Sequence, residues 1–283
     1  MLDNKNKKNV FCFVLFSLNR TFVGRMKKYM YLLLLCLLVG CSRKQSEHGV
    51  MQVKVLNRMT PVKDQGKSQT CWAYAMLAAI ETEHIGRGDS VNLSPAYVEY
   101  MLSREPNALE SKRAMGMTCI NLIMKYGLCA HDAYREYNPD IEPPRQVFMG
   151  GAVYTPQEFA RSVCAPDEYV ALTSNDKEPY GKEIEIDLPD NWEHNHYLNV
   201  PMDTLLKRTV HAVRGHHGVC WESSAHAMAV VGLARDSIGH RFFIMKNSWG
   251  DRDADHGLVY LSFRRFREET LAVEMTREAW GRD

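Results

Sequence analysis

The sequence lacks several features that would identify common classes of protein. Its formal net charge is only +1, and acidic and basic residues are mixed along the chain, so we expect no nucleic-acid partner. Eight cysteines in 283 residues are too few for a fold held together by disulfides. No apolar run is long enough for a comfortable membrane-spanning helix. The remaining composition, 45% hydrophobic and 24% charged, supports a sizeable core in one large domain or two small lobes.

The histidines also lack the spacing of a metal site. They cluster at His194 and His196 and again at His211, His216 and His217. No cysteine or carboxylate stands at metal-ligand spacing from either cluster. We therefore expect these side chains to lie on the solvated surface, and we predict no metal and no cofactor.

The first 40 residues are typical of an export signal rather than of a folded domain. A basic start at Met26-Lys27-Lys28 precedes an apolar stretch that ends near Leu38, so Met26 suits the true start of the chain better than Met1. The next residues, Gly40-Cys41-Ser42, resemble the lipobox of bacterial lipoproteins. The resemblance implies cleavage before Cys41 and a lipid anchor on it, at the periplasmic or cell-surface side of the bacterial envelope. An uncleaved anchor is the alternative.

The rest of the chain divides by its patterning. Residues 41–55 are predicted to form a lipidated tether and residues 56–283 a globular domain. Within this domain, residues from about 65 to 160 have helical patterns, whereas residues from about 165 to 280 are rich in short β-type runs. We therefore expect an α+β protein with an N-terminal helical lobe, a C-terminal antiparallel, barrel-like β lobe, and a cleft between them.

Individual elements follow from turn residues and periodicity. The expected helices cover Cys71 to about His84, a segment that begins at Pro95 behind an N-cap at Ser94, Met117–Tyr126 and Met202–Val213. The expected strands cover Glu183–Leu188, Val219–Glu222, Ala225–Ala234, Arg241–Asn247, Gly257–Phe263 and Leu271–Thr276.

Cys71 is the strongest candidate for a reactive residue. The apolar residues that follow it have the spacing of one buried helix face, at Trp72, Ala75, Met76, Ala79 and Ile80. A thiol at a helix N-terminus lies at the positive end of the macrodipole, which favours the nucleophilic thiolate. A catalytic thiolate also needs a base, a residue that orients the base, and an oxyanion donor.

Downstream segments supply candidates for these roles. His226 begins one apolar strand and Asn247 ends the next, so adjacent strands could place their side chains together. The order Gln65, Cys71, His226, Asn247 resembles that of the papain-like cysteine peptidases. The matching segments are Pro61-Val62-Lys63-Asp64-Gln65-Gly66, Cys71-Trp72-Ala73, His226-Ala227 and Asn247-Ser248-Trp249-Gly250.

The resemblance implies a role for each matching residue. Cys71 would be the nucleophile and His226 the general base and acid. Asn247 would orient the imidazole, and Trp249 would shield the His–Asn hydrogen bond. Gln65 and the Cys71 backbone N–H would form the oxyanion hole.

Within that superfamily the chain looks most like the bleomycin hydrolase and aminopeptidase C branch, as a short, lipoprotein-type member. The residues that carry this likeness are His226-Ala227-Met228, Asn247-Ser248-Trp249-Gly250-Asp251, Asp253, Gly257, and Tyr197, Asn199, Pro201, Met202 and Asp203. The chain also departs from the superfamily. Ser68 stands where secreted members carry a structural cysteine, and Arg113-Ala114-Met115-Gly116-Met117 stands where most members have a substrate-lining Gly-Gly pair.

We therefore predict a cysteine peptidase that acts on peptide or protein substrates through an acyl-thioester, in an aminopeptidase-like manner. An open-cleft endopeptidase and a catalytically silent peptide-binding module are the alternatives. Export would permit disulfides, and the sequence leaves their pairing open among Cys119, Cys129, Cys164 and Cys220. For Cys119 and Cys220 we expect buried, unreactive thiols. The sequence predicts no oligomeric state.

Overall fold

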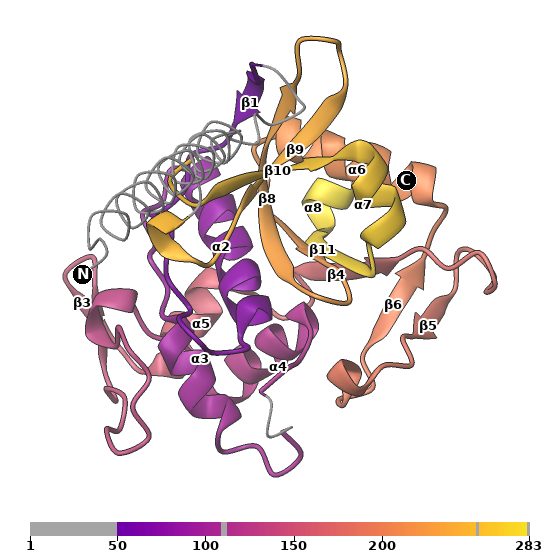
Figure 1. The fold of residues 1–283 in the computed structure, drawn as a ribbon. Coiled ribbons are helices and arrows are strands. Elements are labelled where there is room, and N and C mark those ends of the chain that lie inside the picture. Colours follow the sequence, from indigo (N-terminus) through magenta and orange to yellow (C-terminus); the bar gives the residue numbers. More distant parts are fainter. Residues whose placement is uncertain (1–49, 109–111, 253–254, 282–283) are drawn as a thin grey trace, which may run out of the picture. The chain divides into compact units, whose positions relative to one another are not determined.

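A computed structural model describes residues 50–283 apart from 109–111, 253–254 and 282–283 (Figure 1). The predicted signal peptide, the start at Met26 and the lipidation site at Cys41 lie outside the described residues. In the described part of the chain, no helix has both the length and the apolar character needed to cross a membrane.

One large sheet organises the domain. It contains nine strands, which pair in the order β10-β9-β8-β7-β11-β4-β6-β5, with β1 added against β8. These strands are β1 (Gln52–Leu56), β4 (Tyr169–Thr173), β5 (Glu183–Glu185), β6 (His196–Asn199), β7 (Val219–Glu222), β8 (Ala227–Arg235), β9 (Arg241–Lys246), β10 (Leu258–Ser262) and β11 (Ala272–Thr276). Their pairing is antiparallel except between β4 and β6. A separate hairpin joins β2 (Val147–Met149) and β3 (Ala152–Tyr154).

The folded domain begins earlier than residue 56. β1 pairs antiparallel with the second half of β8, from Gln52 opposite Arg235 to Leu56 opposite Gly232. β7 occupies the first half of the same edge, from Glu222 opposite Ala227 to Val219 opposite Val230. Residues 52–55, predicted to be part of the tether, therefore belong to the sheet.

Seven α-helices lie in the described residues. They are α2 (Cys71–Gly86), α3 (Pro95–Leu102), α4 (Gly116–Tyr126), α5 (Pro156–Val163), α6 (Met202–Arg214), α7 (Phe263–Glu269) and α8 (Arg277–Trp280). The predicted start of α3 is confirmed, because the Ser94 side chain accepts a hydrogen bond from the Tyr97 backbone N–H and Pro95 is the first helical residue. The signal for α5 was present but not recognised: Thr155 and Glu158 form a reciprocal capping box.

α2 differs from the prediction of one buried face. Even its charged residues Glu81 and Glu83 are buried, as are Thr82 and His84. A helix that is buried all round is a core helix rather than an amphipathic surface helix. The first residues of α2 therefore have little freedom to move, which is suitable for a helix that carries a reactive group.

Two separate cores confirm the predicted two-part α+β architecture. Helices α2 to α5 pack around one core, which includes Trp72, Ile80 and Phe159. Helices α6 to α8 pack against the sheet around a second core, which includes Trp221 and Phe243. In Figure 1 these two groups of helices lie on different sides of the molecule, with the long strands β8 and β9 between them.

Candidate active site

Cys71 is the first residue of the buried helix α2. Thr70, which precedes it, is fully buried, and its carbonyl accepts the Ala73 and Tyr74 backbone N–H groups. The neighbouring Trp72 is 1% exposed and donates its ring N–H to the Lys112 carbonyl at 3.0 Å. Packing on both sides of Cys71 thus fixes the helix end, while Cys71 itself stays partly exposed.

The antiparallel pairing of β8 and β9 brings His226 and Asn247 together. His226 directly precedes β8 and Asn247 directly follows β9, and Ala229 lies opposite Lys246 in the register of the two strands. The His226 Nε2 atom lies 2.7 Å from the Asn247 Oδ1 atom. Because an amide oxygen only accepts, Nε2 carries the proton and donates, which leaves Nδ1 as the ring nitrogen available for other chemistry.

Trp249 stacks on the histidine. The two ring centroids are 5.2 Å apart, with an angle of 27° between the ring planes. The Ser248 backbone N–H also donates to Asn247 Oδ1 at 2.8 Å. The segment that follows β9 therefore fixes both the amide that receives the His226 proton and the ring that covers it.

A short antiparallel contact places Gln65 beside the same segment. The Gln65 backbone N–H donates to the Ser248 carbonyl at 2.8 Å, and the Gly250 N–H donates to the Lys63 carbonyl at 3.2 Å. The Gln65 side-chain carbonyl accepts from the Ser248 hydroxyl, while its Nε2 atom donates to the Ser68 carbonyl at 2.5 Å. The side-chain amide is thus held at both ends.

One pocket, with a volume of about 230 Å³, brings these residues together. Its lining includes Gln65, Cys71, His226, Trp249 and Glu222. The segment Arg113-Ala114-Met115 also lines it, and Gly150-Gly151 lies instead in the turn between β2 and β3. The region without a glycine pair therefore forms part of the pocket wall, as its position in the sequence suggested.

Arg113 connects the two lobes across this pocket. Its Nε atom lies 2.9 Å and its Nη2 atom 2.8 Å from Asp190 Oδ2. Nη2 also donates to the Ser224 carbonyl at 2.9 Å, two residues before His226. No local pattern in the sequence predicts this bridge, because it depends on three segments that are far apart along the chain.

The protonation of Cys71 differs from the expectation based on the helix dipole. Burial raises the pKa of the Cys71 thiol, and backbone hydrogen bonds from Ala227 and Trp72 offset this effect only in part. The position at the helix N-terminus therefore does not by itself make Cys71 a thiolate, so a nearby base has to take its proton.

The other described cysteines are buried and form no disulfide. Cys119, Cys129, Cys164 and Cys220 are all free thiols. Burial raises the pKa of Cys129 and of Cys164 to about 12. These thiols are therefore unreactive core residues, as we expected for Cys119 and Cys220.

The histidine clusters have partners within the protein. His217 Nδ1 lies 3.0 Å from a Glu83 carboxylate oxygen, and His194 Nδ1 lies 2.6 Å from Glu185. His216 Nδ1 lies 3.0 Å from the Asn57 side-chain oxygen. His217 is only half-exposed rather than fully solvated, because it joins the end of α6 to α2.

A buried carboxylate joins the three segments that carry the pocket residues. Glu81 on α2 accepts from Lys63 Nζ at 2.5 Å, two residues before Gln65. Its other oxygen lies 3.7 Å from Nζ of Lys246, the residue before Asn247. The Thr60 hydroxyl accepts from Lys246 at 2.7 Å and donates to Glu81 at 2.5 Å. Sequence patterning did not identify this network, although it holds the Cys71, Gln65 and Asn247 segments in place.

Comparisons with known proteins assign the chain to one family. The model of the family described as "Papain family cysteine protease" matches residues 50–278. Ananain from Ananas comosus is 25% identical over 212 residues, which are 72% of this chain and 52% of ananain. A cathepsin L-like peptidase from Aedes aegypti is 24% identical over 213 residues, 73% of this chain and 56% of that protein. The chain thus spans about half the length of these curated relatives.

A solved structure supports the same fold. The crystal structure of PepW from Lactobacillus rhamnosis aligns with a TM-score of 0.61 at 14% identity, and the alignment covers 81% of this chain and 82% of PepW. At this level of identity the likeness concerns the fold alone.

Proposed function

Because the chain belongs to the papain family of cysteine proteases, we propose that it hydrolyses peptide bonds through Cys71, His226 and Asn247. The observation that carries this proposal is the 2.7 Å contact between His226 Nε2 and Asn247 Oδ1, in a pocket that Cys71 also lines. The contact leaves His226 Nδ1 to act on the thiol, as nucleophilic catalysis requires. Peptides or proteins are the substrates of such a centre.

The chemical steps follow from these positions. His226 takes the Cys71 proton, and the sulfur attacks the carbonyl carbon of the scissile bond. The imidazolium then protonates the leaving amine, and the C–N bond breaks to leave a thioester on Cys71. His226 next removes a proton from water, whose oxygen attacks the thioester, and the carboxylic acid leaves as the thiol is restored.

Asn247 and Trp249 act through the histidine. The Asn247 side-chain oxygen fixes the ring with Nε2 protonated, and a neutral amide suffices because the ion pair forms between Cys71 and His226. Trp249, stacked on the ring at 5.2 Å, keeps water away from the His–Asn hydrogen bond.

Gln65 is proposed as the side-chain donor of the oxyanion hole. Its Nε2 atom carries two hydrogens, of which one is directed to the Ser68 carbonyl. The second, together with the Cys71 backbone N–H, would stabilise the negative charge that develops on the substrate oxygen. The Ser248 hydroxyl holds the opposite end of the amide, so the donor is preorganised.

The Arg113 bridge favours an aminopeptidase over an open-cleft endopeptidase. Arg113 and Asp190 line the pocket and the guanidinium joins Asp190 to the Ser224 carbonyl, and we propose that a long chain would have to displace this bridge to pass. A substrate that ends inside the pocket would not. This fits the likeness to the bleomycin hydrolase and aminopeptidase C branch, whereas a catalytically silent peptide-binding module would have no use for the oriented His226.

Thiol labelling and peptide cleavage assays on the full-length protein test this proposal. We expect an iodoacetamide or epoxide probe to label Cys71 in the folded protein, and fluorogenic peptides with free N-termini to be cleaved faster than N-acetylated ones. Cys71→Ala should abolish turnover, and Gln65→Ala should lower kcat by roughly 10²- to 10³-fold. Gln69→Ala is the matched control, since Gln69 lines the same pocket with no proposed role. An unlabelled Cys71 with no turnover would favour the silent module, and preferential cleavage of blocked peptides would favour the endopeptidase.

The location of the enzyme is a separate proposal. We propose that Cys41 carries a lipid anchor that holds the domain at the bacterial envelope. Mass spectrometry of the mature N-terminus should find a diacylglyceryl group on Cys41, and Cys41→Ala should release the protein from membranes. A mature chain that begins elsewhere would contradict this proposal.

A further inference from the structure

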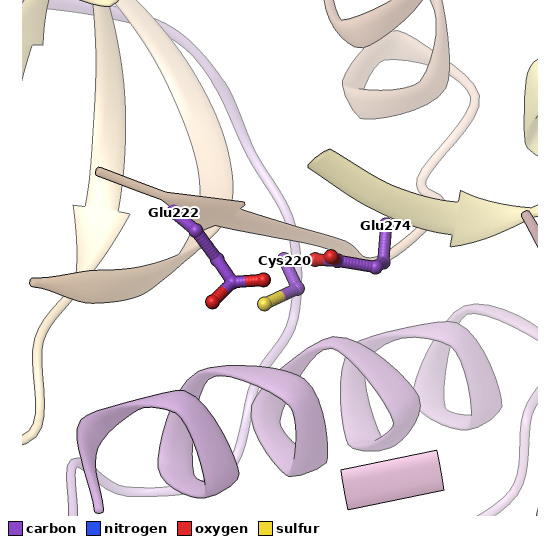
Figure 2. Close-up of side chains that lie close together, drawn as sticks. All are labelled: Cys220, Glu222 and Glu274. Carbon is purple, nitrogen blue, oxygen red and sulfur yellow. The ribbon is translucent and has the colours of Figure 1, made fainter. Parts of the chain in front are cut away.

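A buried pair of carboxyl groups lies beside the active-site pocket. Glu222 on β7 and Glu274 on the neighbouring strand β11 point toward each other and toward Cys220 (Figure 2). Cys220 and Glu222 are two residues apart on one strand, and Glu274 lies directly opposite Cys220 in the register. Glu222 is 4% exposed and Glu274 is fully buried. The protein therefore encloses two acidic groups in a small space.

The surrounding protein supplies no counter-charge. Within the described ranges, no lysine, arginine or histidine forms an ion pair with Glu222 or Glu274. The Gly116 backbone N–H donates to Glu222 Oε1 at 2.9 Å. In the described part of the chain, the only side chains that share hydrogen bonds with the Glu274 carboxyl are themselves acidic groups, the Glu222 carboxyl and the Cys220 thiol. The pair thus has hydrogen bonds but no counter-charge among the described residues, and a positively charged ligand would supply one.

The pocket gives such a group access. Glu222 lines the same pocket as Cys71 and His226. The backbone of Gly116 packs directly against the carboxyl pair on the side of α4, since a Cβ atom there would lie only 2.9 Å from Glu274 Oε2 and 3.2 Å from Glu222 Oε1. The nearest pocket cation, Arg113, is engaged by Asp190 and the Ser224 carbonyl.

We propose that Glu222, backed by Glu274, binds a positively charged group of the peptide substrate as it lies in the active-site pocket. The group is the α-ammonium of a free N-terminus or the side chain of lysine or arginine, since all three carry N–H donors and a positive charge. This inference rests on the proposed peptidase function. It makes Glu222 a specificity-determining residue that acts on binding rather than on bond cleavage.

A metal ion fits the same cluster less well. One ligand atom each of Cys220, Glu222 and Glu274 lies within 4.8 Å of the others. A thiol ligand has to be deprotonated, but burial, together with the two nearby carboxyl groups, holds the pKa of Cys220 well above its usual value. A substrate ammonium needs one negative charge on the carboxyl pair, and Glu222 reaches the pocket. Burial raises the pKa of Glu222, but its hydrogen bonds with Glu274 and with the Gly116 backbone N–H oppose this shift.

Substrates that differ only in charge test the inference. Lysine and norleucine have side chains of similar length, so dipeptide coumarylamides with either residue, each with a free or N-acetylated terminus, form a matched set. We expect wild-type protein to cleave the substrates that carry the recognised charge with a kcat/KM about 10- to 100-fold higher than that of their uncharged counterparts. Glu222→Gln should reduce the ratio of kcat/KM between charged and uncharged substrates to about one. The acetylated norleucine substrate, which carries no charge, measures separately the change at Cys71, since the charge of Glu222 contributes to the raised pKa of that thiol. Glu269→Gln, which makes the same change of net charge on the surface, is the control.

The substrate preference that Glu222→Gln removes identifies the positively charged group that the subsite binds. If Glu222→Gln removes the lysine-over-norleucine preference, the subsite binds a side chain; if it removes the free-over-acetylated preference, it binds the α-ammonium. Equal charge preferences in wild type and Glu222→Gln would overturn the inference, as would a stoichiometric metal, measured by atomic emission, that Cys220→Ser releases. Labelling of Cys71 by the thiol probe keeps the peptidase proposal separate, because a labelled, active enzyme without a charge preference would contradict this inference alone.

Discussion

Two buried carboxylate sites, Glu81 on α2 and the Glu222–Glu274 pair beside the pocket, differ in how their charge is balanced. Glu81 receives hydrogen bonds from Lys63, from the Thr60 hydroxyl and from the Leu93 backbone N–H, and Lys246 lies 3.7 Å away. Glu222 and Glu274 have the Gly116 N–H and no ion pair within the described ranges. The first site has cations on two sides, whereas the second consists of acids alone.

This difference separates a structural site from a binding site. The Glu81 network joins α2 to the loop before Gln65 and to the end of β9. Its ion pairs and hydrogen bonds therefore fix the positions of the Cys71 and Asn247 segments relative to each other. A site with every partner in place has nothing left to offer a ligand. The Glu222 site lies on the pocket wall and has no cationic partner among the described residues, so it can form an ion pair with a bound substrate.

The largest expected effect is the loss of stability when the Glu81 site is broken. Glu81→Gln keeps the size of the side chain but leaves Lys63 and Lys246, which is 4% exposed, without their counter-charge. Removal of one partner from a buried ion pair costs about 3–5 kcal/mol. Burial already lowers the pKa of Lys246 to about 8, so loss of its proton can relieve part of this cost. We expect a loss of about 3 kcal/mol in the unfolding free energy, measured by urea denaturation at pH 7.

The matched control is Glu269→Gln. Glu269 forms an exposed pair with Arg265 on the same helix, and such pairs contribute less than about 0.5 kcal/mol. The double variant Glu81→Gln/Lys246→Met should recover part of the lost stability. If Glu81→Gln costs no more than Glu269→Gln, the proposed division into a structural and a binding site does not hold.

An opposite result is expected for Glu274→Gln. Burial raises the pKa of Glu274 well above its usual value, and the Glu222 charge raises it further. The folded protein therefore keeps a proton that the unfolded chain releases near pH 4.3. The stabilising contribution is complete below that pH and is lost as the pH rises toward the folded-state pKa, by about 1.4 kcal/mol per unit. The variant should match wild type near pH 4 and become progressively more stable than wild type as the pH rises to 7.

Denaturation at several pH values measures this difference directly. The comparison is made within one fold, so the other titrating groups, such as Glu83, whose pKa is lowered mainly by its hydrogen bond to His217 against the effect of burial, largely cancel. A variant that is less stable than wild type at every pH would mean that Glu274 has a favourable partner, and the carboxyl pair would then be structural too.

The sequence predicted the elements whose signals are local. The periodicity of the β-type runs predicted β7 to its residue bounds and β8 to β11 within about two residues, and the turn chemistry of Ser94-Pro95 predicted the start of α3. β1 was missed because its short run gains its identity only from pairing with β8. α2 was read as amphipathic because charged residues were assumed to face solvent, whereas Glu81 and Glu83 are buried with cationic partners.

Prediction of the site residues has the same limit, because only residues in local motifs could be identified. Cys71, His226, Asn247, Gln65 and Trp249 could be named from the sequence because they stand in recognisable motifs. The structure places four of them in the lining of one pocket and joins Asn247 to His226 by a hydrogen bond. Glu222 and Glu274 could not, because a glutamate in a strand normally occupies the solvent face. Their burial depends on α4, whose first residue covers them, and no pattern within either strand encodes that contact.

Two buried threonines allow the finest test of the comparison. The Thr60 hydroxyl accepts from Lys246 and donates to Glu81, whereas the hydroxyl of the fully buried Thr118, in the first turn of α4, has no hydrogen-bond partner among the described residues. Valine has the same shape as threonine but no hydroxyl. Thr60→Val should cost about 1–2 kcal/mol, since it leaves charged groups without a hydrogen bond, and Thr118→Val should be neutral or stabilising. Thermal unfolding of the two variants measures these costs. If both substitutions cost the same stability, the region around α4 and Glu222 has its hydrogen bonds as fully satisfied as the Glu81 site. Glu222 would then have no free capacity to bind a substrate cation.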